Sequence, residues 1–153
     1  MMIADVINKN AIQVNMPALD KQQALESLVN LLYQDGAVDD ATLFIQDVYH
    51  RESEGMTGIG GYIAIPHGKS LHVNRTCIAI GLLEEPIEWE SLDGNKVKAI
   101  ILFAVSMQDK NDFCIKLMSR IARMLGNEQV CENLLNATTN DELISIFNQK
   151  VSL

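Results

Sequence analysis

The sequence predicts a single-domain α/β sandwich, in which a mixed central β-sheet of about five strands is flanked by helices. Its 153 residues make one domain of ordinary size. Apolar runs of strand length fill the middle of the chain, while both ends show helical spacing. The middle strands follow one another without helical crossovers, which favours a mixed sheet over a strict βαβ repeat. We expect one domain over residues 1–153, with its core at about 12–147.

The N-terminal part is expected to form a strand and then a helix. Apolar and polar residues alternate over residues 11–16, which is typical of a strand. Asp20 can cap the helix, with Gln23 in capping-box register, and Gly36 can end it. The apolar face of this helix consists of Leu25, Leu28, Val29 and Leu32.

A second helix is expected next, capped by Asp39 or Asp40. Its last turn carries His50 and Arg51, and basic residues suit that end because the helix dipole is negative there. The face expected to be buried contains Phe44, Ile45, Val48 and Tyr49.

Four more strands are expected in the middle of the chain. Residues 62–65 form a short strand, and residues 76–83 form a nearly continuous apolar one. Residues 99–105 are apolar throughout, which indicates a central strand covered on both faces. Residues 87–90 predict a short strand, followed by a turn at 93–94.

The C-terminal third is expected to be helical. The first helix there should end at Gly126, Asn127 can cap the next, and Thr139 and Glu142 form a capping-box pair for the last. The apolar face of the first helix contains Cys114, Met118, Ile121, Ala122 and Leu125. The apolar residues expected in the other two are Val130, Leu134, Leu135, Leu143, Ile144 and Phe147.

Composition excludes several classes of protein. A net charge of −8 argues against binding to nucleic acid or an anionic membrane, because both need clustered cations. Three widely spaced cysteines provide neither a disulfide framework nor a metal motif, so we expect a reducing, cytoplasmic location. We expect no signal peptide, and no apolar run approaches the ~20 residues of a membrane span.

The segment of residues 58–68, Gly-Ile-Gly-Gly-Tyr-Ile-Ala-Ile-Pro-His-Gly, carries the candidate chemistry. Pro66 cannot donate to a strand ladder, so we expect the strand to end there and His67 to be held on a bend. An imidazole with a pKa of about 6.5 is mostly neutral at neutral pH, and its free lone pair can attack phosphorus. Gly60, Gly61 and Gly68 would let a partner protein approach and expose backbone N–H groups to phosphoryl oxygens.

From the residues alone, other interpretations of this segment stay open. A single histidine in a turn is more often a surface residue than a nucleophile, and Gly-x-Gly-Gly is common in turns. Gly-Lys-Ser at 68–70 resembles the tail of a nucleotide-binding P-loop, but the position where that loop needs its first glycine is Ile63. We therefore predict no nucleotide cofactor, and the spacing of the acidic residues predicts no metal.

Residues 58–68 resemble the active-site segment of the fructose/mannitol-type enzyme IIA domains of the phosphoenolpyruvate-dependent sugar phosphotransferase system. The nitrogen-regulatory enzyme IIA branch shares this segment. The similarity runs from about residue 12 to residue 146, and includes residues 51–52, 85–87, 102–104, 117–125 and 140–143. The resemblance implies one enzyme IIA type-2 domain with the fold of the phosphotransferase/anion transport proteins.

The resemblance also implies a phosphotransferase component that acts as a phosphoryl carrier. The carrier protein HPr would donate the group to His67, and a cognate enzyme IIB would accept it for uptake of a fructose-like sugar or polyol. The membrane component IIC would be involved only indirectly, with no direct membrane insertion of this chain. In the family the phosphate is carried on Nε2, which implies that Nδ1–H is held by a backbone acceptor. Arg51 would supply a fixed cation.

One position departs from the family pattern. Many members carry a second histidine near the nucleophile, where this chain has Cys114 or, with a gap of one residue, Phe113. A cysteine is a weak donor and no persistent cation, so one stabiliser of the phosphorylated state is expected to be missing. This favours a regulatory module whose phosphorylation controls binding to another protein, as the alternative to a transport component. A third interpretation is an interaction domain with a degenerate site.

Other polar residues give weaker signals. His72 could assist the phosphate and His50 lies beside Arg51, but a surface position is the default for both. Lys69, Ser70 and Asn74 could contact a partner, without a specific signal.

Overall fold

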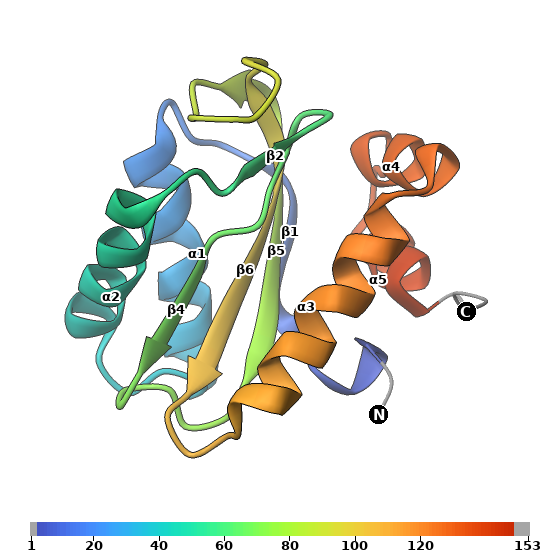
Figure 1. Ribbon diagram of the computed structural model, residues 1–153. Helices are drawn as coiled ribbons and strands as arrows, with labels where there is room; N and C mark the ends of the chain where they lie inside the picture. The colour runs from blue at the N-terminus through green and yellow to red at the C-terminus, as the bar shows by residue number, and fades with distance from the viewer. Residues whose placement is uncertain (1–2, 149–153) are drawn as a thin grey trace.

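The structure, a computed structural model, describes residues 3–148 and confirms the expected α/β class. Within these residues a six-stranded sheet lies between two helical layers (Figure 1). The strands are β1 (Ile7–Met16), β2 (Gly58–Gly60), β3 (Ile63–Ala64), β4 (His67–Ser70), β5 (Cys77–Ile87) and β6 (Val97–Ser106). The helices are η1 (Ile3–Asp5), α1 (Lys21–Asp35), α2 (Ala41–Glu54), α3 (Asn111–Leu125), α4 (Glu128–Leu135) and α5 (Asn140–Asn148).

The sheet is mixed, as expected. Its order is β1-β5-β6-β3-β2, and β4 also pairs with β6. β5 and β6 are antiparallel, while β1 runs parallel to β5 and both β3 and β4 run parallel to β6. The central position of β6 confirms the interpretation of residues 99–105, because this strand has neighbours along both edges and is buried on both faces.

Each face of the sheet has its own hydrophobic core. Alternate side chains of β6 point to opposite faces, so that Ile100 and Leu102 join the cluster beneath α1 and α2. Ile101 and Phe103 join the cluster beneath α3, α4 and α5. Figure 1 shows these two helical layers on opposite sides of the strands. The sheet is therefore a rigid platform, and its strand ends can hold a side chain in a fixed position.

The helix ends follow the local signals. Asp20 Oδ1 accepts a hydrogen bond from the Gln23 N–H at 2.9 Å, and Gly36 ends α1 with a φ of +84°. Asp40, rather than Asp39, caps α2, where its side chain accepts from the Leu43 N–H at 2.9 Å. Asn127 caps α4 in the same way. These short-range predictions are correct because each cap satisfies N–H groups that the first turn leaves without partners.

Two strand predictions are wrong. Residues 88–90 form no strand, since β5 ends at Ile87 and the chain then leaves the sheet. Conversely, β2 and β4 were not expected, because the sequences Gly-Ile-Gly and His-Gly-Lys-Ser lack the apolar alternation of a strand. Both are short segments. Pairing with a neighbouring strand holds each of them extended, so tertiary context rather than intrinsic strand propensity makes them strands.

Some predicted core residues are less buried than expected. In α3 the buried residues are Leu117, Ile121, Met124 and Leu125, so the helix is rotated relative to the predicted face. Cys114 and Met118 are half-buried and Ala122 is exposed. The residues Ile45, Tyr49, Val130, Leu135 and Ile144 are also only half-buried. They lie at the margins of the two cores, where they pack against the fully buried residues.

Candidate functional site

His67 is the first residue of β4, not the last residue of a strand on a bend. The prediction that the strand ends at Pro66 is correct, because β3 ends at Ala64, but His67 then begins a new strand instead of lying on a bend. The Phe103 N–H donates to the Pro66 carbonyl at 3.0 Å, so the ladder uses an acceptor that proline retains rather than the N–H that it lacks. His67 then pairs with Phe103 on β6. The histidine is therefore anchored to the central strand of the sheet, which fixes the direction of its side chain.

Both nitrogens of the His67 ring have partners. Nε2 lies 3.0 Å from Nε of Arg51, and Nδ1 lies 3.4 Å from the carbonyl oxygen of Ile65. Because Arg51 Nε can only donate, Nε2 must accept and the ring proton must be on Nδ1, facing the Ile65 carbonyl. The half-buried ring is thus held as the tautomer whose lone pair is on Nε2.

The surroundings of His67 favour its neutral form. Burial is the main cause that lowers its pKa below the usual 6.5. The Ile65 carbonyl acts in the opposite direction, while the positive charge of Arg51 lowers the pKa further. A neutral imidazole with one accessible lone pair is the form that can act as a nucleophile towards phosphorus.

We expect nucleophilic reactivity at His67 to persist below pH 6.5. A histidine with a lowered pKa stays unprotonated until the pH falls through that lowered value, so its Nε2 lone pair is lost only there. Titration of the His67 ring by nuclear magnetic resonance measures the midpoint directly. A midpoint at or above 6.5 would contradict the proposed environment. The same shift makes the folded state lose stability as the pH falls from about 6.5 through the lowered value.

Arg51 extends from the last turn of α2 towards the histidine. Its Nη1 donates to the carbonyl of Gly55 at 3.2 Å, while Nε donates to His67. Within residues 3–148, the Nη2 group has no hydrogen-bond partner. The guanidinium is therefore held by two bonds and keeps donors for an anion at the ring nitrogen.

Gly68 is required for close packing rather than for an unusual backbone angle. A Cβ on this residue would lie 2.9 Å from Cγ2 of Val48 and 3.1 Å from Cε1 of Phe44, both on α2. The φ of Gly68 is not among the positive values of the structure, so its backbone angles do not require a glycine. Gly68 allows α2, and with it Arg51, to pack directly against β4.

We expect Gly68→Ala to destabilise the protein by about 1–3 kcal/mol, since the added methyl group overpacks the contact with two fully buried side chains. Denaturant unfolding measures the change. Gly55→Ala is the matched control, because a Cβ there would meet only Arg51 Nη1 at 3.8 Å and its φ of 169° suits any residue. Equal stability of the two variants would contradict the packing argument.

Gly60 is the last residue of β2 and Gly61 is the first of the turn to β3, and they have positive φ values of 94° and 63°. The Gly61 N–H donates to Oδ2 of Asp93 at 3.0 Å, and this bond is the main cause that lowers the pKa of the Asp93 carboxyl. The structure therefore brings these glycines to Asp93, and the Gly61 N–H is not free for a phosphoryl oxygen. Their role in phosphate or partner binding stays a prediction.

Cys114 lies in the first turns of α3, close to Lys69. Burial raises the pKa of the Cys114 thiol, while the charge of Lys69 acts in the opposite direction. Lys69 stands two residues after His67 on β4, so the two side chains leave the strand on the same face. Its Nζ donates to Oδ1 of Asn111 at 2.7 Å. Any role of Cys114 in place of a second histidine stays a prediction.

The other polar residues singled out in the sequence have partners of their own. His72 Nδ1 lies 2.9 Å from Asp39 Oδ1, and His50 Nε2 lies 3.5 Å from Glu54 Oε1. The remaining two, Ser70 and Asn74, bond to the backbone of residues 72 and 36. Among the described residues, the hydrogen bonds of the His67 ring go to neither of the other two histidines.

Two buried polar residues near the site were not predicted. Thr57 is 2% exposed and Trp89 is 5% exposed, and the Trp89 N–H donates to Thr57 Oγ1 at 3.1 Å. The indole N–H gives a general signal, since it usually finds a partner when buried. The identity of that partner could not be predicted, because the two residues are 32 positions apart in the sequence.

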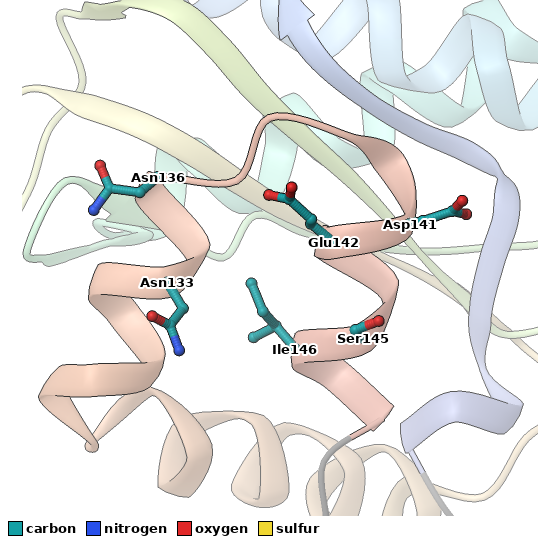
Figure 2. A pocket seen from close by; sticks show the side chains of 6 residues that line it. All are labelled: Asn133, Asn136, Asp141, Glu142, Ser145 and Ile146. Atoms are coloured by element: carbon teal, nitrogen blue, oxygen red, sulfur yellow. The ribbon is translucent and has the colours of Figure 1, made fainter.

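The concave surfaces differ in their relation to His67. A pocket of about 440 Å³ lies between α4 and α5 and is lined by Asn133, Asn136, Asp141, Glu142, Ser145 and Ile146. Figure 2 shows amides and carboxylates around it, and these lining residues include no cation that could hold a phosphoryl group. A second pocket, of about 350 Å³, is lined by Lys69 and Ser70 of β4 together with residues of α2. Of these two pockets, the second is the one next to the strand that carries His67.

Comparisons with known proteins show which family the chain matches. Residues 5–150 match the model of the family "Phosphoenolpyruvate-dependent sugar phosphotransferase system, EIIA 2". A fructose-specific EIIABC component from Bacillus subtilis is 31% identical over 97% of this chain, which spans 23% of that relative. A nitrogen regulatory protein from Pseudomonas aeruginosa is 30% identical, with 87% of this chain and 86% of the relative covered.

The fold has close counterparts as well. The crystal structure of a nitrogen regulatory protein IIA-Ntr from Neisseria meningitidis superposes with a TM-score of 0.87 at 23% identity, covering 95% of this chain and 99% of the other. Among the described residues, every helix is too short or too polar to cross a membrane.

Proposed function

The chain belongs to the EIIA 2 family of the phosphoenolpyruvate-dependent sugar phosphotransferase system, and we propose that it carries a phosphoryl group on Nε2 of His67. The family makes it a phosphotransfer component. In the proposal, phospho-HPr is the donor and a cognate enzyme IIB is the acceptor, in the cytoplasm, for uptake of a fructose-like sugar or polyol. The fructose-specific relative, which joins A, B and C components in one chain, supports a IIB partner.

The observation that carries the proposal is the pair of contacts at the His67 ring. Arg51 Nε lies 3.0 Å from Nε2, and the Ile65 carbonyl faces Nδ1. These contacts select the Nε2 lone pair and place a permanent cation beside it. The ring needs no base to activate it, because burial already lowers its pKa.

Each transfer forms one bond as another breaks. The Nε2 lone pair of His67 forms a bond to phosphorus while the N–P bond of phospho-HPr breaks, and its electron pair returns to the HPr nitrogen. As the group arrives, Arg51 Nε–H shifts from the ring nitrogen to a phosphoryl oxygen, where a planar guanidinium makes charge-assisted bonds. In the second transfer a nucleophile of IIB attacks phosphorus, and the electron pair of the N–P bond returns to His67. Positioning and charge neutralisation supply the catalysis.

A reconstituted relay tests the proposal. Purified enzyme I, HPr and labelled phosphoenolpyruvate should place label on this chain, and the label should be acid-labile and base-stable, as a phosphohistidine is. Omission of HPr is the control, and it should abolish the labelling. Label that appears without HPr, or no label at all, would refute the carrier function.

A regulatory role is the second candidate, and Cys114 favours it because the second family histidine is missing there. The nitrogen regulatory relative from Pseudomonas aeruginosa gives further support. In this case phosphorylation of His67 would change the affinity for another protein by adding negative charge. A panel of IIB domains separates the two candidates, since a transport component passes its label to one of them and a regulatory module retains it.

A further inference from the structure

We propose that Thr57 is a positioning residue that fixes both Arg51 and His67 for transfer, an inference that rests on the proposed function. Thr57 lies between the end of α2 and β2, and it is 2% exposed. It touches neither the His67 ring nor the Arg51 guanidinium in the hydrogen bonds of the structure. Its carbonyl instead bonds to the Ile65 N–H, and its hydroxyl bonds to side chains that hold the segment containing Gly55 in place.

The Thr57 hydroxyl uses both of its hydrogen-bonding capacities. It donates to Oε1 of Glu52 at 2.5 Å and accepts from Nε1 of Trp89 at 3.1 Å. Since the donor and the acceptor are both buried side chains, the hydroxyl proton has one direction and the Thr57 side chain one orientation. The residue thereby links α2 to the segment after β5.

Lys21, the first residue of α1, stabilises this link. Its Nζ lies 2.6 Å from Glu52 Oε2 and 2.7 Å from Glu90 Oε2, and 4.9 Å above the centre of the Trp89 ring. Burial disfavours the charged form of Lys21, but its bonds to Glu52 and Glu90 outweigh this and raise its pKa. A persistent cation thus balances the buried Glu52 carboxylate, and α1, α2 and the segment after β5 meet around Thr57.

The first connection to the site passes through the Thr57 carbonyl. It accepts a hydrogen bond from the Ile65 N–H at 2.9 Å. The Ile65 carbonyl in turn lies 3.4 Å from His67 Nδ1. The position of the Thr57 backbone therefore decides where the acceptor for the ring proton lies, and with it which ring nitrogen keeps the lone pair.

The second connection passes through Gly55, two residues before Thr57. The Gly55 carbonyl accepts from Arg51 Nη1 at 3.2 Å. A glycine at this point adds no stiffness of its own, so the segment depends on the bonds of Thr57 to stay in place. Glu52, which receives the Thr57 hydroxyl bond, directly follows Arg51 on α2. One side chain therefore controls the supports of the nucleophile and of the cation.

Thr57→Val tests the proposal, because valine keeps the shape of threonine and replaces the hydroxyl by a methyl group. It leaves Glu52 Oε1 and Trp89 Nε1 without this partner, so the 55–58 segment can shift. We expect kcat for transfer from phospho-HPr to fall about tenfold, because small misplacements of reacting groups are costly. The KM for phospho-HPr should stay unchanged, since the partner surface is intact. Thr57→Ser, which keeps the hydroxyl, is the matched control and should stay within about twofold of wild type.

A spectroscopic readout separates positioning from general weakening of the fold. Nitrogen chemical shifts of the His67 ring report its tautomer, and wild type should show the Nδ1–H form. Thr57→Val should show a mixture of the two tautomers at neutral pH, with Thr57→Ser unchanged. This measurement needs no phosphotransfer, so it still tests the positioning role if wild type takes no label and the proposed function fails.

A second variant keeps the test decisive if Thr57→Val does not fold. Trp89→Phe retains an aromatic ring over Lys21 and removes the N–H that Thr57 accepts. Like Thr57→Val, it should lower kcat and give a mixture of the two His67 tautomers. The proposal would be overturned if folded Thr57→Val had the wild-type kcat and a pure Nδ1–H tautomer. If Thr57→Val does not fold, the same result for Trp89→Phe would overturn it. A rise in KM alone would also overturn it, since that would place the effect at partner binding.

Discussion

His67→Ala is expected to take no label from phospho-HPr. The substitution removes the only nitrogen of the site that has both a free lone pair and a cation 3.0 Å away. Nothing else among the described residues replaces it, because the other two histidines are engaged with Asp39 and Glu54. The loss should be complete rather than partial, since a carrier without its nucleophile has no covalent intermediate to form. Counting of protein-bound label after incubation with the relay measures it.

His50→Ala and His72→Ala are the matched controls for this experiment, because each removes one of the remaining imidazoles. Both should label at the rate of wild type. His67→Ala should remain folded, since its half-buried ring is not part of either hydrophobic core. Persistent label in a folded His67→Ala protein would refute the central assignment. Loss of label in His72→Ala instead would move the site to the loop after β4.

Local signals in the sequence predicted much of the fold. Asp20, Asp40 and Asn127 each cap a helix, because a cap depends on a side chain and an N–H group three residues away. The apolar run at 99–105 identified the central strand, since a strand buried on both faces has no polar alternation. Such features need no knowledge of distant residues.

The strand that carries the candidate nucleophile could not be predicted in this way. The four residues of β4 include a histidine, a glycine, a lysine and a serine, and only their pairing with β6 makes them a strand. The same limit applies to the site. The sequence of residues 58–68 indicated His67 and the resemblance added Arg51, and the structure brings them together across 16 residues. The hydrogen bonds of Thr57 to Glu52 and Trp89 depend on tertiary packing alone, and no local sequence pattern predicts them.

Arg51→Ala is expected to slow phosphoryl transfer about a hundredfold, or by about 2.7 kcal/mol of activation free energy, without abolishing it. The nucleophile remains, but the transferring group loses its permanent cation. The tautomer preference should weaken as well, because Nε2 loses the donor that requires it to accept. Arg51→Lys should recover only part of the rate, since an ammonium supplies charge without the planar fork. The rate of single-turnover transfer from phospho-HPr is to be measured for wild type, Arg51→Ala and Arg51→Lys.

Arg123→Ala is the matched control. Arg123 is an exposed residue in the last turn of α3, and Arg51 likewise lies in the last turn of its helix, α2. Both variants should unfold at nearly the wild-type denaturant concentration, since each loses a cation at a helix end that contributes about 0.3–1 kcal/mol at most sites. A slow Arg51→Ala beside a fast Arg123→Ala therefore isolates the charge at the ring from the loss of any helix-end cation. Equal rates in the two variants would reduce Arg51 to a helix-end residue, and the selection of Nε2 would then depend on the Ile65 carbonyl alone.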